Sequence, residues 1–358
     1  MRYLIIKTSA FGDVVQTFPV LHYLKAISPK AEIDWVVEKK IAPLVRAHPD
    51  VNRVIEINAK EWKKNLWSAA TWKEAVSFIG DLRQDKYDAV FDLQSNIKSA
   101  SLTLFTKTYA KVGFGWKTAA ERLNCCFIAY RSNPPKGQNI RRDYLYVVQN
   151  FFRDFSSSPC ENVVLGLTEQ ENEIVQQYTN KLPSCVWMVC PGSNWPNKQL
   201  PKEKLKTFLE SSVKAFNPFY LFLCGTADEK KIAQEFHEHF PNSLVCDRLS
   251  LPVIQHLMAK MELVISMDSL PLHLAATTST ATFSIFGPSV SFKYRPLGEQ
   301  HFSFQGSCPY GRTFEKRCPI LRTCSTGSCI RDVNPETIFT TFSQWWNQVQ
   351  NKKKLVVL

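Results

Sequence analysis

Four short polar stretches of this sequence carry side chains that can transfer protons or bind anions. The first runs from Lys7 to Asp13, where small residues lead into a carboxylate. A carboxylate placed where a strand gives way to a helix can take a proton from an incoming hydroxyl group, which is the action of a general base. The alternative for Asp13 is structural, because aspartate is also a preferred N-terminal cap of a helix.

The other three stretches offer groups that suit a nucleotide. Hydroxyl and ammonium groups bind phosphate, an acidic residue after a strand can hold ribose hydroxyls, and exposed amides at a helix start suit a diphosphate. Each stretch also has a structural alternative: a polar surface loop, acidic charge that favours the first turn of a helix, or a buried core histidine. The residues concerned are Ser193 and Lys198, then Glu229, and last Asp268, Ser269 and His273.

Apolar runs and helical spacing predict the elements that position these stretches. Strands are predicted at Tyr3–Lys7, Ile33–Val37, Val54–Ile57, Ala89–Leu93, Val186–Cys190, Tyr220–Cys224, Leu263–Ser266 and, as the last, Thr282–Phe286. Helices are predicted at Asp13–Ile27, Thr71–Arg83, Lys202–Lys214, Ala227–His239, Leu272–Ala276 and Glu336–Gln350. Because strands and helices alternate, we expect parallel α/β sheets. The three nucleotide-like stretches follow strands of one half, so we expect them to line one crevice.

Length and composition limit the number of domains and exclude several classes of nucleotide-binding protein. A chain of 358 residues suggests two domains, and Ser156–Pro159 has the composition of a linker. We place the boundaries at 1–160, 161–335 and a terminal segment 336–358. The sequence contains neither G-x-G-x-x-G nor a Walker A motif, which argues against a dehydrogenase or a P-loop protein.

Charge and cysteine content predict the compartment and the kind of partner. The formal charge of +12 favours anionic partners without choosing among nucleotides, phosphorylated glycolipid, membrane and nucleic acid. We expect a cytoplasmic chain, since it has no apolar run of about 18 residues and no signal peptide. Eleven scattered cysteines fit a reducing compartment. Four of them have the spacing C-x9-C-x5-C-x4-C, namely Cys308, Cys318, Cys324 and Cys329. Because no C-x2-C pair is present, we interpret them as reduced structural thiols. A zinc site is the alternative.

As a set, these stretches resemble the lipopolysaccharide core heptosyltransferases, glycosyltransferase family 9. The matching segments are Ile6–Val15, Asp88–Ser99, Gly113–Arg122, Pro191–Lys198, Gly225–Glu229, Met267–Ala276 and Phe286–Pro288. The resemblance implies the α/β GT-B fold, with two Rossmann-like domains facing across a central cleft. The N-terminal domain would bind the acceptor and the C-terminal domain the nucleotide sugar, followed by a C-terminal helix and basic tail.

The resemblance also implies a reaction and roles for individual residues. It is strongest to the members that add the first heptose to Kdo, and it implies inverting transfer of L-glycero-D-manno-heptose from ADP-heptose to a Kdo-containing lipid A precursor, without cofactor or metal. Asp13 matches the catalytic base, and Leu270 stands where the family usually has glycine. The implied donor-binding residues are Ser193, Lys198, Glu229, Asp268, Ser269 and His273; the implied acceptor-binding residues are Lys60, Lys63, Lys64 and Lys98.

An acceptor embedded in a membrane implies where the protein works. We expect a monomer on the cytoplasmic face of the inner membrane, with its basic N-terminal half against the anionic leaflet. Nucleic-acid binding is not expected, because no recognised motif accompanies the charge. The alternatives are a non-enzymatic nucleotide-binding module of the same fold and a family 9 enzyme with a different sugar or acceptor.

Overall fold

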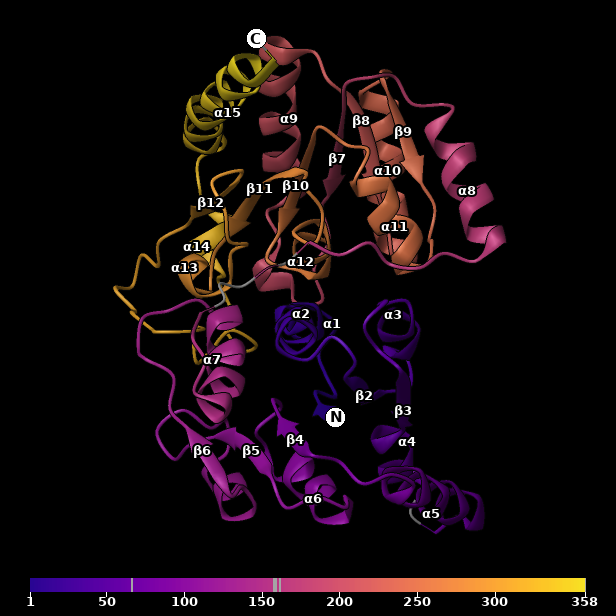
Figure 1. Cartoon of the computed structure of the whole chain (residues 1–358). Coiled ribbons are helices and arrows are strands. Elements are labelled where there is room, and N and C mark those ends of the chain that lie inside the picture. Colours follow the sequence, from indigo (N-terminus) through magenta and orange to yellow (C-terminus); the bar gives the residue numbers. More distant parts are fainter. Residues whose placement is uncertain (66, 157–159, 161, 358) are drawn as a thin grey trace. The chain divides into compact units, whose positions relative to one another are not determined.

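The chain forms two compact α/β units. The structure, a computed structural model, describes residues 1–65, 67–156, 160 and 162–357. The units are Met1–Gly166 and Leu167–Leu358, and each is built on one six-stranded sheet (Figure 1). Of the linker predicted at Ser156–Pro159, only Ser156 belongs to the described residues.

The N-terminal unit has the strand order β3-β2-β1-β4-β5-β6, with every neighbouring pair parallel. Its strands are β1 (Arg2–Ile6), β2 (Glu32–Glu38), β3 (Arg53–Ile57), β4 (Ala89–Asp92), β5 (Lys111–Phe114) and β6 (Tyr130–Ser132). Its helices are α1 (Phe11–Val15), α2 (Phe18–Ile27), α3 (Ala42–Arg46), α4 (Ala59–Lys64), α5 (Ala69–Arg83), α6 (Ile97–Phe105), the 3-10 turn η1 (Arg122–Phe127) and α7 (Ile140–Phe152).

The C-terminal unit has the order β12-β11-β10-β7-β8-β9, again parallel throughout. Its strands are β7 (Val186–Cys190), β8 (Phe219–Leu223), β9 (Ser243–Cys246), β10 (Leu263–Met267), β11 (Ala281–Phe286) and β12 (His301–Gln305). Its helices are α8 (Glu169–Thr179), the 3-10 turn η2 (Pro196–Lys198), α9 (Lys202–Phe216), α10 (Ala227–His239), α11 (Leu251–Met258), α12 (Leu270–Ala275), α13 (Ser291–Tyr294), α14 (Ser328–Arg331) and α15 (Pro335–Val357).

Both sheets have the strand order of a doubly wound, Rossmann-like fold. The order reverses between β1 and β4 in the first unit and between β7 and β10 in the second. In such sheets the crevice that binds ligands lies outside the carboxyl ends of the strands at this reversal. The loops after β1, β4, β7 and β10 are therefore the positions where the fold favours a binding site.

The predicted parallel α/β architecture is confirmed, with local corrections. The helix predicted at Asp13–Ile27 is instead α1 and α2, because Pro19 has no amide hydrogen and its ring would clash with the carbonyl four residues earlier. Pro19 lies in the first turn of α2, where neither problem arises. The strand predicted to be last is followed by β12, which pairs with β11 at the edge of the sheet.

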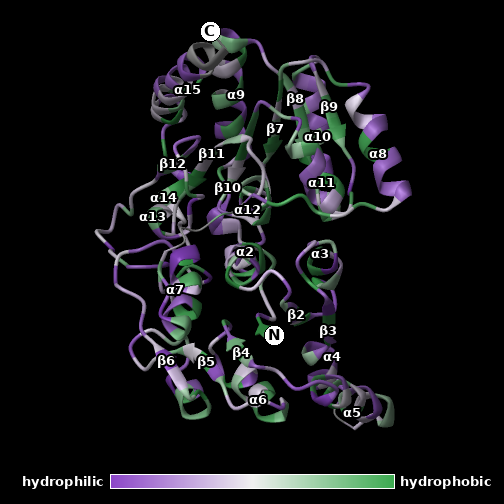
Figure 2. Ribbon diagram, in the orientation of Figure 1, coloured by the Kyte–Doolittle hydropathy of each residue, from purple (hydrophilic) through white to green (hydrophobic). Residues whose placement is uncertain are grey.

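Aromatic side chains fill the core of the C-terminal unit. Trp187 of β7 packs against Phe342 and Trp346 of α15, with ring centroids 5.4 Å apart in both pairs. Figure 2 shows apolar colouring along the central strands and hydrophilic colouring on parts of α10, which packs on β8 and β9, as expected for a helix that covers a buried sheet. Among the described residues, no helix is both long and apolar enough to span a bilayer.

Candidate functional site

The loop after β1 is held by residues that follow β4. The amide groups of Thr8 and Ser9 both donate to Gln94 Oε1 at 3.1 Å. The buried Lys7 Nζ donates to the Leu93 carbonyl at 3.2 Å. These bonds cross the reversal between β1 and β4 and fix the backbone that leads into α1.

Asp13 is the third residue of α1 and not its N-cap. The N-cap is Ala10, and its amide donates to Asp13 Oδ2 at 3.3 Å. The carboxylate thus stabilises the helix start from inside the first turn, where the helix dipole favours negative charge. Because Asp13 is only partly buried, this structural contact leaves room for the same carboxylate to meet a substrate hydroxyl.

Asp92, at the end of β4, organises the neighbouring loop and was missed by the sequence analysis. It is fully buried and accepts hydrogen bonds from the Ser95 amide at 2.9 Å, the Ser99 hydroxyl at 2.9 Å and Asn124 Nδ2 at 2.6 Å. Burial raises the pKa of Asp92, and these hydrogen bonds oppose the rise. The only available signal was an acidic residue at the end of an apolar strand, followed by serines and asparagines.

Two of the predicted acceptor-binding lysines lie around one carboxylate. Glu38 ends β2, and burial raises its pKa while Lys60, Lys40 and Lys98 act to lower it. Lys60 and Lys98 are 38 residues apart in the sequence, yet both lie close enough to Glu38 to influence its pKa. Both side chains are exposed, as an anion-binding role requires.

The other two predicted lysines are on the exposed part of α4. Lys63 and Lys64 occupy its last turn, and Lys64 Nζ lies 3.0 Å from Glu61 Oε1. Trp62 anchors the helix, since its ring packs edge-on against the buried Phe78 with centroids 5.5 Å apart. The packing of Trp62 therefore fixes the position of α4 and its lysines, and Glu61 partly neutralises the charge of Lys64.

In the C-terminal unit, the loops after β7 and β10 meet in a buried ion pair. Lys198 Nζ is paired with Asp268 Oδ2, although the two side chains are only 8% and 5% exposed. His273 Nε2 lies 3.8 Å from Asp268 Oδ1. Burial acts to raise the pKa of Asp268, but Lys198 and His273 outweigh it and hold the pKa below its usual value. Three predicted donor residues thus form one charged cluster at the strand reversal.

Glu229 connects the loops after β7 and β8. Its Oε2 accepts hydrogen bonds from the amides of Gly225 at 2.7 Å and Thr226 at 3.2 Å, so it caps the start of α10. Its Oε1 lies against Gly192, where an added Cβ would be only 1.7 Å away. Glycine at position 192 therefore allows the carboxylate to lie against the loop that contains Ser193 and Lys198.

The two predicted serines are partly exposed beside these groups. Ser193 lies in the loop after β7, and Ser269 is the N-cap of α12, with its Oγ 3.4 Å from the Met267 carbonyl. The helix predicted to start at Leu272 starts at Leu270. Leu270 therefore has helical backbone geometry, which does not require glycine.

Comparisons with known proteins place the chain in a family. The model of "Glycosyltransferase family 9 (heptosyltransferase)" matches residues 75–323. Lipopolysaccharide heptosyltransferase 1 of Pseudomonas aeruginosa is 30% identical over 333 residues, which cover 90% of this chain and 89% of that protein. The Escherichia coli K12 protein of the same name is 28% identical over 301 residues, covering 81% and 88%. The structure of E. coli heptosyltransferase WaaC with ADP-2-deoxy-2-fluoro heptose is similar with a TM-score of 0.70 and 26% identity, covering 86% of this chain and 94% of that one.

Proposed function

This chain belongs to glycosyltransferase family 9, and from that membership we propose that it transfers L-glycero-D-manno-heptose from ADP-heptose to Kdo of a lipopolysaccharide precursor. The observation that carries the proposal is the buried pair of Lys198 and Asp268 at the strand reversal of the C-terminal unit. A buried, oriented ammonium group suits a leaving diphosphate. Support for the donor also comes from the WaaC structure, whose bound molecule is an ADP-heptose analogue.

In the proposed reaction, Asp13 removes the proton from the acceptor hydroxyl. The oxygen then attacks the anomeric carbon of heptose, the bond from that carbon to the diphosphate oxygen breaks, and ADP leaves with inversion at the carbon. Lys198, oriented by Asp268, stabilises the negative charge that develops on the diphosphate. Because the Lys198 ammonium group is already oriented before the reaction, few side chains have to reorient as negative charge develops on the diphosphate.

The remaining predicted residues complete the donor site in this proposal. Glu229 binds the ribose hydroxyls through the oxygen that faces Gly192, while its other oxygen stays with the two backbone amides. Ser193 and Ser269 offer hydroxyl groups to the phosphates from the loops after β7 and β10. His273 acts through Asp268, whose carboxylate it helps to keep ionised.

A donor panel tests the proposal directly. The purified protein is incubated with a Kdo-lipid A acceptor and with ADP-heptose, ADP-glucose or UDP-glucose, and the products are weighed by mass spectrometry. We expect a mass gain of one heptose with ADP-heptose alone. Transfer of another sugar would make this a family 9 enzyme of different specificity, and ADP binding without turnover of any donor would make it a nucleotide-binding module.

The acceptor lysines give a separate prediction. Replacing Lys60, Lys63 and Lys64 together by alanine should raise the KM for the acceptor by about tenfold or more, because contacts of ammonium groups with anions are charge-assisted. The affinity for ADP should stay within about twofold, since these side chains belong to the other unit.

A matched control removes the same charge elsewhere. Lys30, Lys107 and Lys181 are also exposed, and the triple alanine variant of these residues should keep the wild-type acceptor KM. Loss of ADP binding with normal acceptor binding in the Lys60, Lys63 and Lys64 variant would mean that the roles of the two units have been assigned the wrong way round.

We also propose that the protein works as a monomer at the cytoplasmic face of the inner membrane, where its acceptor lies. The supporting feature is a surface around α4 and α5, here called the α4–α5 surface. It combines exposed apolar side chains, of which Trp67 is 99% exposed, with basic ones, and comprises Lys63, Lys64, Trp67, Trp72, Lys73 and Val76. Tryptophan prefers the interface of a bilayer, and each lysine near an anionic leaflet contributes about 1 kcal/mol.

Vesicle binding tests this surface. Replacing Trp67 and Trp72 by alanine should lower partitioning onto phosphatidylglycerol vesicles by about tenfold, because the apolar area that enters the interface is lost. The variant Trp116→Ala removes an exposed tryptophan outside the surface and should bind as the wild type does. Equal losses in both variants would count against a membrane contact at α4 and α5.

A further inference from the structure

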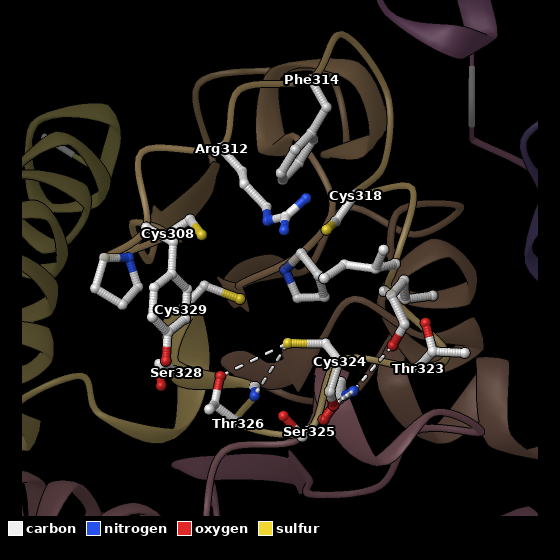
Figure 3. A pocket seen from close by; sticks show the side chains of 17 residues that line it. Cys308, Arg312, Phe314, Cys318, Thr323, Cys324, Ser325, Thr326, Ser328 and Cys329 are labelled. Atoms are coloured by element: carbon white, nitrogen blue, oxygen red, sulfur yellow. Dashed lines mark hydrogen bonds between the residues drawn. The ribbon is translucent and has the colours of Figure 1, made fainter.

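Four cysteines within one segment, residues 308–329, line one cavity of the C-terminal unit. The cavity has a volume of about 270 Å³ and lies beside the long segment between β12 and α14. Figure 3 shows the sulfur atoms of all four turned toward the same space, with Arg312 reaching into it. The four residues are Cys308, Cys318, Cys324 and Cys329.

Cys324 is surrounded by hydrogen-bond donors suited to a thiolate. The amide of Gly327 donates to its sulfur at 3.4 Å, and the Thr326 hydroxyl lies 3.7 Å from the same atom. Gly327 has a φ of +60°, a left-handed conformation that glycine adopts readily. Amides that point at a cysteine sulfur are a common feature of metal–thiolate sites, where they tune the bound metal.

Cys329 is placed at the cavity by close backbone packing. Its carbonyl oxygen lies against Gly306, where an added Cβ would be 1.9 Å away, and its sulfur lies against Gly287. These glycines directly follow β12 and β11, so the ends of two neighbouring strands position the cysteine.

The segment that carries the cysteines is basic. Between 308 and 331 the charged residues are Arg312, Glu315, Lys316, Arg317, Arg322 and Arg331. A divalent ion bound by four thiolates has a net charge of −2, which a basic surrounding stabilises. The segment also has little regular structure for its length, and long loops of this kind in compact domains tend to be functional.

From this convergence we propose that Cys308, Cys318, Cys324 and Cys329 bind one metal ion, Zn²⁺ or Fe²⁺, in a tetrahedral thiolate site. Four protons leave the thiols and four metal–sulfur bonds form, with no change in oxidation state. Four thiolates select these metals over Mg²⁺ or Ca²⁺. Among the described residues no three Cys, His, Asp or Glu side chains are close enough to hold an ion as they lie, so the sulfurs must move inward into the cavity on binding.

A metal ion at this site would stabilise the loop after β7, which contains Lys198. Asn197 Nδ2 donates to the carbonyls of Leu321 at 2.9 Å and Cys324 at 2.8 Å, and the next residue is Lys198. The Arg322 guanidinium also stacks on Trp195 of the same loop, 4.4 Å from the ring centroid. Fixing Cys324 on a metal ion therefore fixes Asn197 and the backbone of Lys198. This consequence rests on the proposed function, whereas the metal site itself does not.

Metal analysis of the full-length chain tests the site. Protein purified without chelators should hold about one zinc or iron ion per chain, and replacement by Co²⁺ should give thiolate-to-cobalt charge-transfer absorption. The double variant Cys318→Ser, Cys324→Ser should lose the metal. The control Cys126→Ser, Cys185→Ser changes two exposed cysteines outside the cavity and should keep it.

Two results would overturn the site. One is a wild-type protein that holds no metal and takes up neither zinc, iron nor cobalt under reducing conditions, a measurement that needs no variant to fold. The other is equal metal content in the cavity variant and the control. Removing the metal from the wild type should also weaken ADP binding by about tenfold, the effect of losing one or two buried hydrogen bonds. An unchanged affinity for ADP would show that the metal does not stabilise the loop after β7, and it would leave the metal site itself in place.

Discussion

Replacing Asp13 by asparagine should lower kcat by at least about 100-fold, the contribution of a positioned general base. Asparagine has nearly the same shape, and its amide oxygen can still accept the hydrogen bond from Ala10 N that Asp13 Oδ2 accepts. The melting temperature and the affinity for ADP should therefore stay close to the wild type. Turnover of ADP-heptose, ADP titration and thermal unfolding of the same preparation measure all three.

The variant Asp13→Ala separates catalysis from helix capping. Alanine removes both the base and the first-turn carboxylate that accepts at the start of α1, so this variant should be inactive and also up to about 1 kcal/mol less stable. If Asp13 only stabilises the helix, Asp13→Asn will remain active while Asp13→Ala loses stability. An active Asp13→Asn enzyme would place the base at another residue.

Replacing Lys198 by methionine should damage stability and donor use together. Removing one partner of a buried ion pair leaves an uncompensated charge, which costs about 3–5 kcal/mol. Asp268 would be that charge, since its side chain is 5% exposed. We also expect kcat/KM for ADP-heptose to fall by about 100-fold or more, because the ammonium group that we propose stabilises the leaving diphosphate is lost.

A double variant distinguishes the structural effect from the functional one. Lys198→Met with Asp268→Asn removes both charges, and most of the stability should return because no buried ion is left unpaired. Activity should not return. Recovery of both would mean that Lys198 serves the fold alone, and the free energies of unfolding from the two single variants complete the cycle.

The acid dependence of stability follows from the same pair. The folded-state pKa of Asp268 is below its ordinary value, so its contribution is fully present above the unfolded pKa of about 3.9. The contribution is lost as pH falls through the lower, folded pKa. The part of the stability difference between the wild type and the double variant that comes from Asp268 should thus stay constant from neutral pH to about pH 5 and change only in stronger acid.

Long apolar strands could be predicted from the sequence, and short edge strands could not. The prediction for Val186–Cys190 has the same bounds as β7, because five consecutive buried residues leave no alternative to a central strand. β6 has only three residues, of which Tyr130 and Arg131 are exposed, so its sequence has no apolar run. The interruption at Pro19 was readable in principle, because proline in a helix interior is a known break.

The candidate site was predictable as a set of loops but not as a set of contacts. Lys198 and Asp268 are 70 residues apart, and their pairing depends on β7 and β10 being neighbours, which no local pattern encodes. Gln94 was missed as a positioning residue for the same reason, since its partners lie in the loop after β1, and so was the contact between Asp92 and Asn124 of η1. The four cysteines show the limit most clearly: their spacing argued against a metal, while the fold brings them to one cavity.

The repeated strand order has a consequence for how such an enzyme can diversify. Each unit has its own sheet and its own crevice-forming reversal, so a substitution that alters the crevice of one unit leaves the scaffold of the other intact. If the N-terminal unit binds the acceptor and the C-terminal unit binds the donor, as proposed, the two preferences are separate traits, open to selection one at a time. Recombination between relatives near Gly166, where the units divide, would exchange one trait as a block and yield chimaeras with new sugar–acceptor combinations.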